Sequence, residues 1–107
     1  MIVITVDMDD LTLDVKGHAG SAPEGKDLIC CAVSVTVQQL IHSLESMDIE
    51  HGNIKNLDYQ MHAGNVHLKI IPKEWGRITV KNRMSYAVEG LQLIADNYPD
   101  YVKLEEK

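Results

Sequence analysis

Cysteine is scarce in this 107-residue chain: there are only two, Cys30 and Cys31, and they are adjacent. Adjacent cysteines rarely form a structural disulfide and no third cysteine exists, so a disulfide framework within one chain is excluded. The C-x-x-C element of common thiolate-rich zinc sites is missing, and the histidines at positions 42, 51, 62 and 67 show no metal-ligand spacing. We therefore expect no metal and no other cofactor.

Basic residues are also few. The chain has 10 Lys and Arg against 16 Asp and Glu, which gives a net charge of −6. Binding to phosphate backbones needs a basic face, so this balance disfavours a free-standing nucleic-acid binder. It is compatible with binding a basic protein segment.

Long apolar runs are missing too. No stretch approaches the roughly 18 residues that can span a membrane. Residues 1–7 alternate between side-chain types without a basic leader region, which predicts a strand and not a signal peptide. We expect no membrane association and a cytoplasmic location.

The length and the 45% hydrophobic content predict one domain over residues 1–107. Alternating apolar residues predict five strands, around residues 2–6, 11–15, 57–61, 66–70 and 101–104. Apolar residues at helical spacing predict helices over about residues 27–47 and 78–97. The order β-β-α-β-β-α-β predicts an α+β two-layer sandwich with a mostly antiparallel sheet.

The most informative segment joins the second strand to the first helix. Gly17-His18-Ala19 ends the strand, and Cys30 falls in the first turn of the helix. A cysteine is a nucleophile as its thiolate, which a helix N-terminus and a nearby imidazole both favour. Unpaired backbone N–H groups at the same helix end would stabilise an oxyanion. The segment therefore predicts a His18–Cys30 pair for nucleophilic catalysis, although buried free cysteines are commonly inert packing residues.

The motif resembles a known family. Gly17-His18-Ala19, followed after a short glycine-containing loop by Gly25-x-Asp27-x-x-Cys30-x-Ala32-Val33-Ser34, is similar to the ribosomal-processing cysteine protease family called Prp. The similarity extends over the whole length and the order of elements. It implies a bacterial cytosolic homodimer that removes an N-terminal extension from large-subunit ribosomal protein twenty-seven, its precursor substrate. It also implies that His18 is the catalytic histidine and Cys30 the nucleophile.

Residues near His18 and Cys30 are predicted to support the pair. Asp27 is predicted to cap the helix, to orient His18, or both. A carboxylate this close to Cys30 would oppose thiolate formation unless its hydrogen bonds direct it elsewhere. Ser34 lies one turn after Cys30 and either hydrogen-bonds near the sulfur or bonds back to the Cys30 carbonyl. Gly17, Gly20 and Gly25 predict a flexible loop that closes over a bound peptide.

Cys31 departs from the usual family pattern, which has a small residue there. One residue is about 100° around a helix, so Cys30 and Cys31 cannot both face His18. We interpret Cys31 as a small packing residue.

Two other functions stay open at this point. The first is a non-enzymatic ribosome-associated module that binds a peptide, with Cys30 in a packing role. The second is a redox sensor that uses the adjacent thiols, which the missing C-x-x-C spacing does not support.

Overall fold

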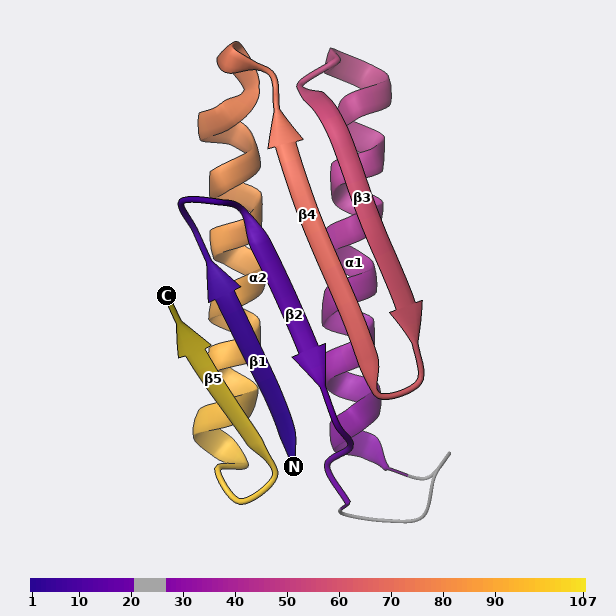
Figure 1. Cartoon of the computed structure of the whole chain (residues 1–107), viewed down its shortest axis with the longest axis vertical. Helices are drawn as coiled ribbons and strands as arrows, with labels where there is room; N and C mark the ends of the chain where they lie inside the picture. Colours follow the sequence, from indigo (N-terminus) through magenta and orange to yellow (C-terminus); the bar gives the residue numbers. More distant parts are fainter. Residues whose placement is uncertain (21–26) are drawn as a thin grey trace.

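Five strands and two long helices form two layers (Figure 1). The structure is a computed structural model that describes residues 1–20 and 27–107. The elements are β1 (Ile2–Asp7), β2 (Thr12–Lys16), α1 (Leu28–His51), β3 (Ile54–His62), β4 (Asn65–Pro72), the 3-10 helix η1 (Glu74–Gly76), α2 (Arg77–Asn97) and β5 (Val102–Glu106). Their order confirms the predicted α+β two-layer sandwich.

The sheet has the strand order β3-β4-β2-β1-β5. Its pairs are antiparallel except β1 with β5, which run parallel. The long chain segment containing α1 and β3 therefore returns to place β4 beside β2. In that pair Lys16 lies opposite Asn65, so the end of β2 meets the turn between β3 and β4.

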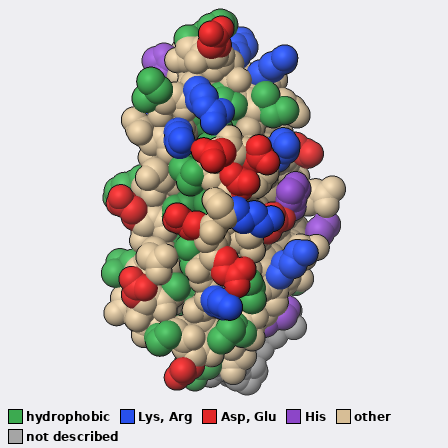
Figure 2. Space-filling view, turned by 60° about the vertical axis from the view of Figure 1, so that its left-hand side comes forward, with side chains coloured by type: hydrophobic (Ala, Val, Ile, Leu, Met, Phe, Trp, Pro, Cys, Tyr) green, Lys and Arg blue, Asp and Glu red, His purple; other side chains and the backbone are tan. Residues whose placement is uncertain are grey.

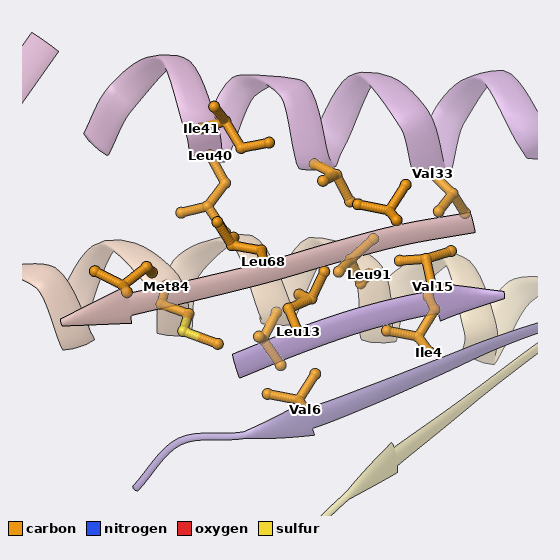
Figure 3. Close-up of a cluster of buried hydrophobic side chains, with 14 of the residues drawn as sticks. Ile4, Val6, Leu13, Val15, Val33, Leu40, Ile41, Leu68, Met84 and Leu91 are labelled. Carbon is orange, nitrogen blue, oxygen red and sulfur yellow. The ribbon is translucent and has the colours of Figure 1, made fainter. Parts of the chain in front are cut away.

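The core lies between the sheet and the two helices, where side chains from β1, β2 and β4 point towards α1 and α2 (Figure 3). Alternate residues of β1 are buried, as the sequence pattern predicts. The predicted stripe on α1 is also confirmed, and its buried residues are Ile29, Val33, Val37, Leu40, Ile41, Leu44 and Met47. On the face shown in Figure 2, acidic and basic side chains are interspersed without a continuous basic area, in keeping with the net charge of −6.

Helix α1 is one turn longer than predicted. It ends at His51, and Gly52 caps it in the left-handed conformation at φ 63°, with its N–H donating to the Asp48 carbonyl at 2.8 Å. The added turn follows Met47, the last buried residue, so apolar periodicity gives no sign of it. Glycine at this position is favoured because it has no side chain to oppose a positive φ.

Judged by length and composition alone, one helix contradicts the expectation that no segment could span a membrane. One helix in the described part of the chain, Leu28–His51, is long and apolar enough, with 28% of its most apolar window buried. The core helix of a soluble protein passes the same test. Because α1 packs its buried stripe on the sheet, this observation is weak evidence for a membrane segment.

Candidate active site

Segments far apart in the sequence meet at one end of the molecule. Figure 1 shows the N-terminus, the end of β2, the β3–β4 turn and the first turn of α1 at this end. They surround a pocket of about 360 Å³ that contains both His18 and Cys30. The remaining lining residues are Ile2, Val15, Gly17, Val33, Ser34, Gln38, Met61, His62, Ala63, Gly64, Asn65 and Val66. A larger groove of about 970 Å³ between α1 and α2 is lined by neither cysteine nor histidine, so the smaller pocket is the candidate active site.

Cys30 lies in the first turn of α1, half-buried and packed against the core. Its sulfur accepts a hydrogen bond from the backbone N–H of Ala19, with an N···S distance of 3.2 Å. This bond joins the segment after β2 to the helix that carries the thiol. A backbone N–H aimed at sulfur also favours the thiolate over the thiol, since the anion is the better acceptor.

Other groups around the sulfur have the opposite effect. Partial burial raises the pKa of the Cys30 thiol above its ordinary value, and the hydrogen bond and negative charge of Asp27 raise this pKa further. The Ala19 N–H and the positive amino terminus act in the lowering direction. The influences that raise the pKa of the Cys30 thiol outweigh those that lower it, against the lowering that the helix end and the imidazole predict.

Asp27 caps α1, as predicted. Its side chain is buried, and Oδ1 accepts hydrogen bonds from the N–H groups of Ile29 at 3.1 Å and Cys30 at 3.0 Å. The N–H of Cys31 donates to the Asp27 carbonyl at 3.1 Å. These three donors of the first turn are thus already engaged, so the expectation that N–H groups beside Cys30 serve as oxyanion donors does not hold for them. The second predicted role of Asp27, orientation of His18, stays a prediction.

His18 is exposed at the rim of the pocket, and its ring lies against the β3–β4 turn. A Cβ atom added to Gly64 would be 2.7 Å from Nε2 of His18. The backbone before the ring is held by the same turn, because the Gly17 N–H donates to the Gly64 carbonyl at 2.9 Å. Gly17 has φ 95° and no room for a side chain, since an added Cβ would collide with the carbonyl oxygen of Met1.

The other predicted residues divide into three groups. Ser34 lines the pocket on the same side of α1 as Cys30. Gly20 is exposed, with φ 73° and open space around an added Cβ, whereas Gly25 lies outside the described residues. Cys31 is exposed, so its interpretation as a packing residue is wrong. The helical stripe already indicates this, because Cys31 falls outside the buried positions of α1.

Sequence reasoning missed the β3–β4 turn as part of the site. His62, Ala63, Gly64 and Asn65 all line the pocket. The Gly64-Asn65 pair predicts a turn, but its position beside His18 depends on the pairing of β4 with β2. No group of three or more metal-binding side chains occurs within residues 1–20 and 27–107.

Comparisons with known proteins agree with this fold. The profile of a family described as cysteine protease Prp matches residues 1–103. A structure of the S. aureus ribosomal processing protease Prp with a covalently linked product peptide is 17% identical, with a TM-score of 0.77 over 100% of both chains. A second structure of that protease, with a substrate peptide, is 16% identical, with a TM-score of 0.71 over 100% of both chains.

The protein SMU.848 from Streptococcus mutans has 19% identity and a TM-score of 0.67, covering 98% of this chain and 90% of that chain. No curated protein matches the sequence. At these identities the solved structures establish the shared fold, while the profile match over nearly the whole chain establishes the family. The chain belongs to the cysteine protease Prp family and is a cysteine protease.

Proposed function

We propose that this protein is an endopeptidase that removes the N-terminal extension of large-subunit ribosomal protein twenty-seven, with Cys30 as nucleophile and His18 as general base and acid. The observation that carries the proposal is one pocket containing both side chains, with the Ala19 N–H on the Cys30 sulfur. Membership of a protease family favours the enzyme over a non-enzymatic peptide-binding module.

The reaction begins with a proton transfer. The Cys30 thiol gives its proton to the His18 imidazole, and the sulfur bonds to the carbonyl carbon of the scissile peptide. The tetrahedral oxyanion collapses, the C–N bond breaks, and His18 returns the proton to the leaving amine. Water then attacks the thioester, His18 accepts a proton from that water, and the sulfur regains a proton as the acid product leaves.

Because the pKa of the Cys30 thiol is raised, the proposed role of His18 is to accept the thiol proton. A thiol at rest must lose its proton before or during attack, so a base within the pocket is required. The Ala19 N–H supports the developing negative charge on sulfur, because it already donates to that atom at 3.2 Å. Once sulfur is acylated it becomes a weak acceptor, and the same N–H is then a candidate donor to the oxyanion.

The substrate is proposed to be a protein precursor bound in extended form. Part of the pocket lining is apolar and at least half-buried: Ile2, Val15, Val33, Met61 and Val66. An apolar lining suits burial of a side chain next to the scissile bond. The S. aureus protease structures, which share this fold, contain a substrate peptide and a covalently linked product peptide, which supports a peptide substrate for this chain. A homodimer in the bacterial cytoplasm, without direct nucleic-acid or membrane contact, completes the proposal on the family resemblance.

The test is cleavage of the bacterium's own ribosomal protein precursor, followed by mass spectrometry. The wild type is compared with Cys30→Ala, His18→Ala and Cys31→Ala. We expect cleavage to be lost with the first two and kept with Cys31→Ala, because Cys31 is exposed outside the pocket. Full cleavage by Cys30→Ala would overturn the assigned nucleophile. Intact precursor with a folded wild type would exclude this substrate.

A further inference from the structure

We propose that Gly64, in the β3–β4 turn, is a positioning residue that holds the imidazole of His18 in the pocket. The inference rests on the proposed role of His18 as the catalytic base. It adds a residue that does not touch the reacting atoms and acts only through the ring of His18.

The ring of His18 occupies the space that a side chain at position 64 would need. A Cβ added to Gly64 would be 2.7 Å from Nε2, 3.2 Å from Cε1 and 3.3 Å from Cδ2 of His18. Carbon contacts of low energy are about 3.5–4.0 Å, so any side chain at this position requires the ring to move. The nearest ring atom is Nε2, one of the two nitrogens that can carry the proton, so the added Cβ meets that atom first.

The turn also holds the backbone that leads to this ring. The Gly64 carbonyl accepts a hydrogen bond from the Gly17 N–H at 2.9 Å, and Lys16 pairs with Asn65 between β2 and β4. These backbone contacts do not depend on the side chain at Gly64. A substitution there therefore moves the imidazole while the chain on either side stays anchored.

Position 64 needs a control for backbone strain, because Gly64 has φ 75°, which opposes ordinary side chains. Gly52 provides that control. It has φ 63° at the C-terminal end of α1, and an added Cβ would meet only Lys73 Nζ, at 3.8 Å. Figure 1 shows this end of α1 opposite the end that carries the site. Gly52→Ala thus introduces similar strain without contact to His18. Gly64→Asn is the second variant, because Asn tolerates positive φ but still brings a Cβ.

The first measurement is steady-state cleavage of a peptide that contains the leader sequence. We expect Gly64→Ala and Gly64→Asn to lower kcat by about 10- to 100-fold with KM within about twofold, because misplacing a catalytic group by about 1 Å can cost 100-fold. Gly52→Ala should stay within about twofold of the wild type. Thermal unfolding is measured for all variants. A wild-type kcat in Gly64→Asn, or an equal loss in Gly52→Ala, would overturn the inference.

A double-mutant comparison tests whether Gly64 acts through His18. The readout is the alkylation rate of Cys30 by iodoacetamide in a Cys31→Ala background, which remains measurable in an inactive enzyme. Gly64→Ala should change this rate when His18 is present and leave it unchanged in His18→Ala. An equal change in both backgrounds would show an effect independent of the ring and would refute the inference.

The two proposals fail in different ways. If His18→Ala retains full activity, the proposed function fails and this inference fails with it. If His18→Ala is inactive while Gly64→Ala and Gly64→Asn match the wild type, only the positioning role is refuted. NMR signals of the His18 ring give an activity-independent check, since they should shift in Gly64→Ala and stay in place in Gly52→Ala.

Discussion

Substitution of Asp27 separates two effects of one carboxylate. Asp27 is 8% exposed, and its Oδ1 accepts from the N–H groups of Ile29 and Cys30 at 3.1 and 3.0 Å. Asn caps helices about as well as Asp, so Asp27→Asn keeps an acceptor and removes the charge. Asp27→Ala removes both.

The expected stability changes follow from the cap. Loss of an N-cap side chain costs about 0.5–2 kcal/mol in the free energy of unfolding, and a buried cap with two acceptor bonds belongs in the upper half of that range. At about 4–8 °C per kcal/mol for a domain of this size, Asp27→Ala should lower Tm by about 5–16 °C. Asp27→Asn should change the free energy of unfolding by less than about 0.5 kcal/mol.

The reactivity of the Cys30 thiol should increase even in Asp27→Asn, the variant that keeps the helix cap. Asp27 raises the pKa of the Cys30 thiol through its hydrogen bond and its charge, so Asp27→Asn lowers that pKa and increases the thiolate fraction at neutral pH. The assay is iodoacetamide labelling at pH 7 in a Cys31→Ala background, so that only Cys30 reacts. An unchanged or slower rate in Asp27→Asn would refute the electrostatic argument. A loss of stability equal to that of Asp27→Ala would refute the argument about the cap.

Three further predictions concern the thiols and the core. In the wild type Cys31 should be alkylated several-fold faster than Cys30 at pH 7, because Cys31 is exposed and Cys30 is half-buried with a raised pKa. Mass spectrometry of the labelled peptides measures the two rates. Equal rates would contradict this order. Because the folded-state pKa of Cys30 is raised, its contribution to stability is complete below the ordinary thiol pKa of about 8.5 and is lost as pH rises through the folded value. The free energy of unfolding of the wild type, measured with urea, should therefore fall above about pH 8.5 more than that of Cys30→Ala. Parallel dependence on pH in the two proteins would count against the shift. Leu44→Ala should lower the free energy of unfolding by about 2–5 kcal/mol, because Leu44 is 0% exposed. Leu28 is 80% exposed, so Leu28→Ala should lower it by less than about 0.5 kcal/mol. Similar losses in the two variants would contradict the described core.

Most of the fold is predictable from the sequence because burial here follows simple periods. The alternation of Ile2, Ile4 and Val6 gives β1, and the stripe from Val33 to Met47 gives the buried face of α1. The end of a helix is harder to predict where its last turn is polar. The last turn of α1 buries no side chain, so only the cap at Gly52 shows where the helix ends.

The site was predictable only where its residues are close in sequence. His18, Asp27 and Cys30 fall in one strand–loop–helix segment, so one motif identifies them together. Gly64 belongs to the same pocket because β4 pairs with β2, and no local pattern specifies that pairing. The sequence places the Asp27 carboxylate near Cys30, but the sign of the Cys30 pKa shift also depends on burial and on the direction of that carboxylate, which are properties of the folded chain.

The Asp27 carboxylate links the stability of α1 to the protection of Cys30, the proposed nucleophile. The bonds that hold the first turn of α1 also place a negative charge beside Cys30, which raises the pKa of its thiol. Oxidation of cysteine follows thiolate character and exposure, so a protonated and half-buried Cys30 is less susceptible than a permanent thiolate. Attack then needs a proton acceptor in the pocket. Two imidazoles line it, His18 and His62, and His18 is the one proposed as the base. In the proposed mechanism the contact of the His18 ring with Gly64 sets the position of the proton acceptor, which is why both variants at position 64 should alter kcat more than binding.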